Sequence, residues 1–390
     1  MKKITALALT LCMCLLMFAG CGSNDNAATS QASSSSAESS AASESATGTR
    51  TVTDMGGREV TIKGEVKSIV NLWPSYTTTL YVLGAGDLVS AVGTNSTVNS
   101  WTEFFYPRSA EIQALGGTTP NVEEIAALDP DLVILHPSSV QAGYDKQLEE
   151  LGIPALNVNF DSYETMIESL NVLGQAVGGD VQKKVDKLTK TISDKLENNR
   201  KLTADLPDED KPVVYYISGI NDSLTGTMAG EDTFQESWVE ANGGIYAGAQ
   251  LEVGEDAEEV VAEDVLALNP DVIMIGNVYQ HKLMEELQNT PGWQDLDAVK
   301  NGRVYTIPLG CWGWDRFGAE SAMMLDYALY CIQPKIAEEN NITRDMLIEE
   351  TIDFYKTYNG TELTKEQAGY LLDGLSPTGG DLLEEREGQQ

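Results

Sequence analysis

Residues 180–206 read DVQKKVDKLTKTISDKLENNRKLTADL and predict one long, mostly polar helix in the middle of the chain. Apolar residues recur three or four positions apart, at Val181, Val185, Leu188, Ile192 and Leu196, which gives the helix one narrow buried stripe. At ~1.5 Å per residue it would extend about 39 Å, far beyond an average helix. A two-stranded coiled coil is the alternative, but the stripe lasts too few heptads and its e and g positions lack sustained charge. We therefore expect this helix to connect two lobes.

An internal sequence repeat predicts that the chain has two lobes of similar structure. Residues 121–135, NVEEIAALDPDLVIL, recur without a gap as residues 261–275, VAEDVLALNPDVIMI. In each copy a short helix ends at Asp-Pro or Asn-Pro, because proline cannot continue a helix. The apolar run that follows fits a strand buried on both faces of a parallel sheet. A unit repeated once, at long separation, predicts two similar α/β lobes rather than a solenoid.

The first 49 residues lie outside both lobes. Lys2 and Lys3 precede an apolar stretch, residues 4–18, that is too short for a membrane span and predicts a signal peptide over residues 1–20. Ala-Gly-Cys at positions 19–21 resembles a bacterial lipobox, in which Cys21 becomes the lipid-bearing first residue; an ordinary secretory signal is the alternative. Residues 22–49 are rich in Ser, Ala and Thr, so residues 21–49 predict a disordered tether.

Charge and cysteine content limit the possible partners and the possible disulfide bonds. The chain has 25 basic and 60 acidic residues and a formal net charge of −35, which excludes nucleic acid as a partner. An anionic ligand would need local cations. Cys311 and Cys331 are few and unpatterned; they could pair in an oxidising exterior, but free thiols are the preferred interpretation.

Alternating strands and helices place the remaining boundaries. We expect an N-terminal lobe over residues 50–178, the connecting helix over 179–206, a C-terminal lobe over 207–376 and a disordered acidic tail over 377–390. Ligands of open α/β sheets bind outside the carboxyl ends of the strands. The candidate ligand-binding residues there, with two scarce arginines, are Trp73, Tyr76, Trp101, Arg108, His136, Tyr216, Asn277, Tyr279, Trp312, Trp314 and Arg316. His136 is either a pocket-wall side chain or a metal ligand.

Several motifs together carry a family resemblance, at residues 54–60, 83–88, 121–135, 151–154, 262–275, 298–305 and 353–360. Through them, residues 51–372 resemble the substrate-binding proteins of ABC importers for ferric siderophores, haem and cobalamin. The resemblance implies two similar Rossmann-like α/β lobes joined by one long backbone helix. It further implies a monomeric, extracytoplasmic receptor, anchored to the membrane through Cys21, without a resident cofactor.

The same resemblance implies the class of ligand and the partner, although none of its motifs identifies the ligand. A ferric siderophore is the leading ligand, a corrinoid or haem comes next, and a small oxyanion comes last. The partner would be an ABC permease dimer with its cytoplasmic ATPase. Family members use one glutamate per lobe to meet permease arginines, and Glu123 and Glu263 hold matching positions in the two repeat copies. Acids are also common in a helix's first turn, where they complement its dipole, and the neighbouring Glu124 and Asp264 are alternatives.

Two other classes of protein compete with a transport receptor. A metal-dependent enzyme is disfavoured because the sequence has two histidines and lacks Gly-x-Ser-x-Gly, phosphate-loop, Cys-x-x-Cys and His-Glu-x-x-His motifs. An adhesion lipoprotein would need neither paired lobes nor aromatic residues at strand ends. Saturable small-molecule binding without turnover separates the three.

Overall fold

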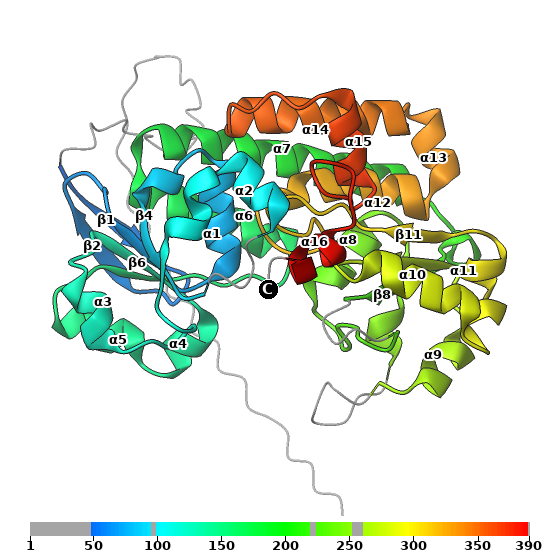
Figure 1. The fold of residues 1–390 in the computed structure, drawn as a ribbon, viewed down its shortest axis with the longest axis horizontal. Helices are drawn as coiled ribbons and strands as arrows, with labels where there is room; N and C mark the ends of the chain where they lie inside the picture. The colour runs from blue at the N-terminus through cyan, green and yellow to red at the C-terminus, as the bar shows by residue number, and fades with distance from the viewer. Residues whose placement is uncertain (1–47, 95–98, 219–223, 252–259, 389–390) are drawn as a thin grey trace, which may run out of the picture. The chain divides into compact units, whose positions relative to one another are not determined.

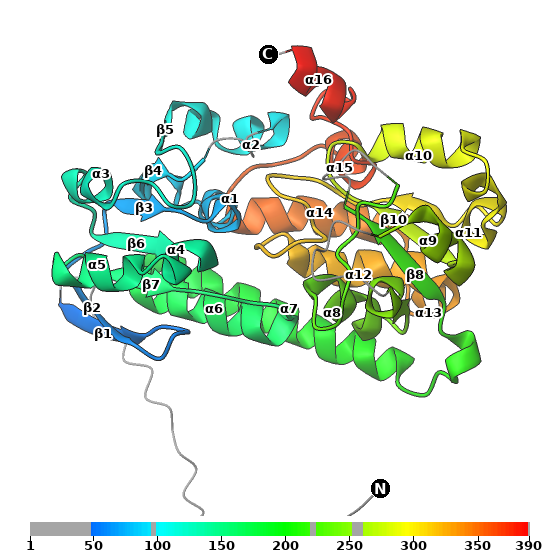
Figure 2. The ribbon, with the colours of Figure 1, turned by 90° about the horizontal axis from the view of Figure 1, so that it is seen from below.

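The computed structural model describes residues 48–94, 99–218, 224–251 and 260–388. These residues form two α/β lobes, both belonging to one compact unit, with helix α7 (Gly179–Thr203) extending along the two (Figures 1 and 2). The expected fold class, two α/β lobes with a long backbone helix, is confirmed.

The N-terminal lobe is built on a five-stranded parallel sheet in the order β5-β4-β3-β6-β7, beside an antiparallel hairpin of β1 and β2. Its strands are β1 (Thr49–Thr53), β2 (Glu59–Lys63), β3 (Ile69–Asn71), β4 (Val89–Val92), β5 (Gln113–Ala114), β6 (Leu132–Leu135) and β7 (Ala155–Asn157). Its helices are α1 (Pro74–Val82), α2 (Ser100–Phe105), α3 (Val122–Ala127), α4 (Pro137–Gln141), α5 (Tyr144–Glu150) and α6 (Tyr163–Val177).

The C-terminal lobe has a four-stranded parallel sheet in the order β11-β10-β8-β9. Its strands are β8 (Val213–Ile217), β9 (Ile245–Tyr246), β10 (Val272–Ile275) and β11 (Val304–Thr306). Its helices are α8 (Phe234–Ala241), α9 (Ala262–Leu268), α10 (Gln280–Asn289), α11 (Asp297–Lys300), α12 (Ser321–Ile332), α13 (Pro334–Glu339), α14 (Arg344–Tyr358), α15 (Lys365–Leu372) and α16 (Leu382–Gly388).

Helix α7 is bound to both lobes by its buried stripe and by polar side chains. All five apolar residues of the expected stripe are buried. The Lys184 ammonium donates to the backbone oxygens of Leu83, at the end of α1, and Tyr358, at the end of α14, each at 2.6 Å. Further along, the buried Asn199 amide donates to Leu325 O in α12 at 3.0 Å. These acceptors belong to the ends of α1 and α14 and to α12. Helix α7 is therefore attached to other helices near both of its own ends.

The two repeat copies adopt the same local structure. Asp129 and Asn269, which precede the repeated prolines, both have a φ of 45°, a left-handed conformation that Asp and Asn tolerate best after Gly. Asp131 N donates to Ser68 O and Asp271 N donates to Val213 O, each at 2.9 Å. The strands that follow, β6 and β10, are both interior strands of their sheets. The repeat is therefore one supersecondary unit used twice.

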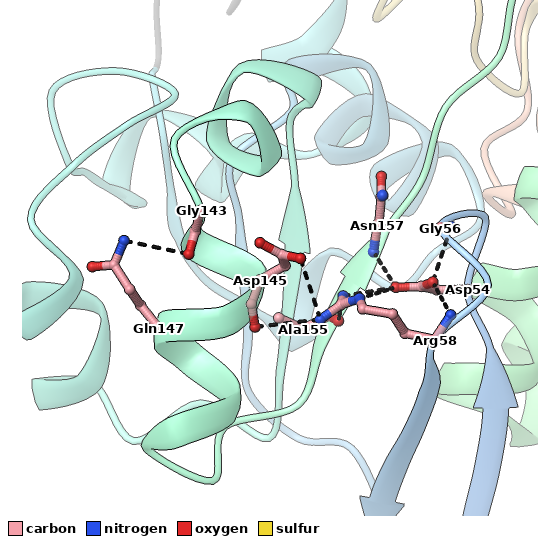
Figure 3. Close-up of polar contacts among 8 residues, drawn as sticks. All are labelled: Asp54, Gly56, Arg58, Gly143, Asp145, Gln147, Ala155 and Asn157. Carbon is pink, nitrogen blue, oxygen red and sulfur yellow. Dashed lines mark hydrogen bonds and ion pairs between the residues drawn. The ribbon is translucent and has the colours of Figure 1, made fainter.

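The hairpin motif at residues 54–60 is held to the N-terminal sheet by a buried carboxylate (Figure 3). Asp54 accepts hydrogen bonds from the backbone N–H groups of Gly56, Arg58 and Asn157 at 3.0, 2.9 and 3.1 Å. The Arg58 guanidinium is 2.7 Å from Asp54 Oδ2 and also donates to Ala155 O at 2.9 Å. Since Ala155 and Asn157 bound β7, the Asp54–Arg58 pair fixes the hairpin turn against the end of that strand.

The end of the chain differs from the expected disordered tail. Residues 382–388 form α16, and the side chain of Leu382 is 3% exposed within the main hydrophobic core. An isolated antiparallel bridge joins Leu375 to Asp381 just before this helix. A high content of acids favours disorder, whereas in this segment Leu382 is buried and Leu383 packs against the same core.

Candidate functional site

A cavity of about 500 Å³ lies where strand-end segments of the two lobes meet. Most of its walls are aromatic or apolar, and its lining residues are Trp73, Pro74, Thr118, His136, Phe160, Asp161, Tyr216, Met228, Asp232, Thr233, Phe234, Gln235, Trp312, Arg316 and Phe317. Five of the residues selected from the sequence are among them: Trp73, His136, Tyr216, Trp312 and Arg316. The volume falls within the range of small-molecule sites.

Trp73 forms the N-terminal wall because the end of β3 holds its backbone. Trp73 N donates to the buried Asn71 side chain at 3.1 Å, and Asn71 Nδ2 donates back to Trp73 O at 2.8 Å. Pro74 then begins α1, since proline suits the first helical position. The Trp73 ring stacks on Phe160, with centroids 4.8 Å apart and planes 7° apart. The wall is thus a rigid aromatic surface.

His136 directly follows β6, and one of its ring nitrogens already accepts a hydrogen bond from the backbone. Its Nδ1 accepts from Ser138 N at 3.1 Å and thereby caps helix α4. A backbone N–H can only donate, so Nδ1 carries no proton and the neutral ring carries its proton on Nε2. Burial lowers the pKa of His136 and so favours that neutral form. This arrangement fits a pocket-wall donor better than a metal ligand.

The loop of residues 309–317 forms part of the C-terminal wall, beside residues 228–235, and a buried glutamate positions the loop. Glu320 accepts from Cys311 N at 2.9 Å and Trp312 N at 2.8 Å, and Tyr355 OH also donates to it. A Cβ at Gly310 would overlap with the side chains of Glu320 and Tyr355, so the turn requires glycine there. Burial raises the pKa of Glu320 to about 7, against the opposing effect of these bonds.

Two phenylalanines that the sequence analysis missed join the lobes across the cavity. Phe317 of the C-terminal lobe contacts Phe160, with ring centroids 3.8 Å apart, and Trp73, with centroids 5.3 Å apart. Phe160 follows β7, and Phe317 directly follows Arg316. The strand-end criterion that selected Trp73 therefore also applied to Phe160.

Three of the aromatic residues expected in the site lie in the core instead. The Trp101 ring is fully buried and its Nε1 donates to Leu375 O at 2.7 Å. Trp314 is also fully buried and packs edge-on against Tyr327, 6.2 Å between centroids. Tyr76 is 3% exposed, and its hydroxyl bonds to Ser169 of α6. Trp101 and Tyr76 are held by segments far away in sequence, and Trp314 packs against the following helix α12, so the residues next to each side chain gave no sign of its direction.

The remaining three expected ligand residues also lie off the cavity. Arg108 is 60% exposed and pairs with Asp87 at 2.8 Å. Asn277 turns the chain with a φ of 68°, and its side chain accepts from Val278 N. Tyr279 packs between two hydrophobic clusters. At the end of β10, a Cβ on Gly276 would come within 2.8 Å of the Asp315 carboxylate, so the 309–317 loop packs closely against this strand end.

Glu123 and Glu263 occupy equivalent exposed positions in the first turns of α3 and α9. Their neighbours Glu124 and Asp264 are equally exposed. Cys21, the signal peptide and most of the tether lie outside the described residues. Cys311 and Cys331 are buried free thiols.

Within the described ranges, no group of three or more His, Cys, Asp or Glu side chains is arranged to hold a metal ion. Of the helices in those ranges, none has the length and apolar character required to cross a bilayer.

The fold and the cavity are those of a two-lobed solute-binding protein, with aromatic strand-end segments around a cavity between the lobes. The chain belongs to the periplasmic binding protein family, whose sequence profile matches residues 69–309. It is 34% identical over 262 residues to the ABC transporter substrate-binding lipoprotein YvrC of Bacillus subtilis (strain 168), covering 66% of this chain and 77% of that protein. It is accordingly the substrate-binding component of an ABC importer and not an enzyme.

Two further comparisons bear on the fold and the ligand. A cobalamin-binding protein of Halobacterium salinarum is 26% identical over 232 residues, which cover 58% of each chain. The crystal structure of a periplasmic solute binding protein from Veillonella parvula superposes with a TM-score of 0.70 at 22% identity, covering 85% of this chain and 98% of that one. The second comparison supports the fold alone.

Proposed function

We propose that this protein is a lipid-anchored, monomeric receptor that captures a metal chelate, first of all a ferric siderophore, and delivers it to an ABC permease. The observation that supports this proposal is the cavity of about 500 Å³ with aromatic side chains from both lobes. Aromatic side chains supply large contact areas with few rotatable bonds, which suits a broad, rigid chelate. The donors of such a chelate already fill the metal's coordination sphere, so the receptor needs no metal ligands of its own.

A corrinoid is the second candidate, and the cobalamin-binding relative from Halobacterium salinarum favours it. A corrinoid also encloses its metal and presents broad faces, so the same aromatic walls serve. Haem follows it, as a third broad, metal-bearing macrocycle. The candidates differ in their absorption spectra, so protein purified from its own host distinguishes them directly, by its spectrum and by mass spectrometry of the released ligand.

The binding site is tested with Trp312→Ala. Trp312 lines the cavity, and its removal should weaken binding of the captured chelate about ten- to a hundredfold, as truncation of an aromatic hot spot does. The matched control is Phe104→Ala, which removes a 36%-exposed aromatic residue of α2 outside the cavity. Tryptophan emission measured during titration gives the affinities. Equal affinities in the two variants would refute the assignment of the site.

For delivery, we propose that Glu123 and Glu263 contact arginines on the two halves of the permease dimer. Both carboxylates are exposed, and the repeat gives them matching places in α3 and α9. A matched pair of charges fixes the orientation of docking as well as adding attraction. An exposed ion pair is worth only about 0–1 kcal/mol, whereas breaking a desolvated interface pair costs about 2–5 kcal/mol.

Docking is tested with the double variant Glu123→Ala, Glu263→Ala. Transport and binding to the permease should fall, while chelate affinity stays unchanged, because neither residue lines the cavity. The matched control is Glu124→Ala with Asp264→Ala, which removes the same charge one position along each helix. Full transport in the first variant, or an equal loss in the control, would argue against this pair of contacts.

A further inference from the structure

The arginine in the cavity is neutralised before any ligand arrives. Arg316 Nε lies 3.3 Å from Asp315 Oδ2, and Arg316 Nη2 donates to Ser218 O at 3.2 Å. The guanidinium carbon is 5.8 Å from the centroid of the Trp312 ring. The Arg316 side chain is 20% exposed, while that of Asp315 is completely buried. The guanidinium thus meets the cavity as one half of an ion pair.

Asp315 is built into the fold rather than free to move away. Tyr216 OH donates to its Oδ2, and its backbone oxygen accepts from Gln235 Nε2 and Trp238 Nε1, each at 3.3 Å. Side chains at Gly276 and Gly313 would both overlap with its carboxylate. The surroundings therefore fix the position of this negative charge, and a ligand cannot easily displace it.

The rest of the cavity adds negative charge only. Arg316 is the one basic residue among the described residues that line it, whereas Asp161 and Asp232 line it from opposite lobes and are exposed. With Asp315, three acids face one arginine. The internal segments outside the described residues, NSTV at 95–98, GINDS at 219–223 and EVGEDAEE at 252–259, contain no Lys or Arg. None of these three segments can therefore contribute a basic side chain.

We infer that the cavity selects neutral or cationic chelates with apolar faces and rejects polyanionic ones, and that Asp315 determines this selectivity by neutralising Arg316. The inference rests on the proposed function and narrows it to one charge class of ligand. An anionic chelate would lose its hydration in an aromatic cavity without gaining a free cation. The exposed carboxylates of Asp161 and Asp232 would also repel an anionic ligand. Many binding sites use such repulsion to reject a close competitor.

The test uses three chelates of different charge. Purified protein is titrated with cyanocobalamin, a neutral corrinoid; ferrioxamine B, a cationic ferric trihydroxamate; and ferric dicitrate, an anionic chelate. We expect at least one of the first two to bind at least about tenfold more tightly than ferric dicitrate, a difference of ~1.4 kcal/mol. Tightest binding of ferric dicitrate would overturn this inference and leave the proposed function standing. Absence of saturable binding with every chelate, including that released from the host protein, would defeat the proposed function itself.

Two sets of variants test the role of the charges. Asp315→Asn keeps the shape and an acceptor for Tyr216 while freeing the Arg316 charge, so affinity for ferric dicitrate should rise about tenfold relative to ferrioxamine B. Because a buried change can impair folding, Asp161→Asn with Asp232→Asn provides an exposed alternative with an expected shift of about threefold in the same direction. The control is Asp87→Asn, an exposed acid paired with Arg108 away from the cavity. The inference would be overturned by unchanged relative affinities in the variant Asp161→Asn with Asp232→Asn, or by an equal shift in the Asp87→Asn control.

Discussion

Replacing Asp54 with alanine should destabilise the N-terminal lobe strongly without affecting the cavity. Three backbone N–H groups, of Gly56, Arg58 and Asn157, would lose their acceptor, and the Arg58 guanidinium would lose its ion-pair partner (Figure 3). An unpaired donor costs about 1–3 kcal/mol when it is buried, and less here, because Gly56 is exposed and Arg58 and Asn157 are half-buried. The Arg58 side chain keeps its bond to Ala155 O. Because it is also 25% exposed, water partly replaces the lost ion pair with Asp54.

Taken together, these losses predict a decrease of about 3–5 kcal/mol in the free energy of unfolding, a large part of the ~5–15 kcal/mol typical of a folded protein. Urea unfolding followed by circular dichroism measures it, and Asp54→Asn, which keeps one oxygen, should lose about half as much. The control is Glu65→Ala, where the removed acid is 59% exposed and pairs with the exposed Lys67, so the change should stay within ~0.5 kcal/mol. A loss below ~1 kcal/mol for Asp54→Ala would refute the reasoning.

Three further predictions concern the anchor, the cavity loop and the response to pH. Cys21→Ala should move the protein from the membrane fraction to the soluble fraction, and retention at the membrane would count against lipidation. Glu320→Gln places an NH₂ group against a backbone N–H, so chelate affinity should fall about three- to tenfold with faster amide exchange at Trp312; unchanged exchange would contradict its positioning role. Because burial lowers the pKa of His136, the unfolded chain takes up its proton first on acidification, and the contribution of His136 to stability should fall as the pH drops below about 6.5, whereas the raised pKa of Glu320 acts in the opposite direction. His136→Asn, which still caps α4, should show a shallower fall between pH 7.5 and 5.5, and identical profiles would disprove the assignment.

The architecture could be predicted from the sequence, because the features that specify it are local and periodic. The apolar stripe of α7 depends only on helical spacing. In each repeat copy, the short helix, the proline that ends it and the strand that follows are all specified within a few residues. Burial of every stripe residue and the shared φ of Asp129 and Asn269 show that these local rules were sufficient.

Which side chains at the strand ends face the cavity depends on tertiary packing and could not be predicted. A tryptophan in a loop has no periodicity to indicate its direction, and its environment depends on distant segments. Trp101 is held by Leu375, 274 positions away, whereas Trp73 is held by Asn71 just before it and meets the cavity. The effective charge of Arg316 likewise depends on how Tyr216 and two glycines enclose Asp315. Local spacing cannot encode such contacts, because they form only when separate elements pack together.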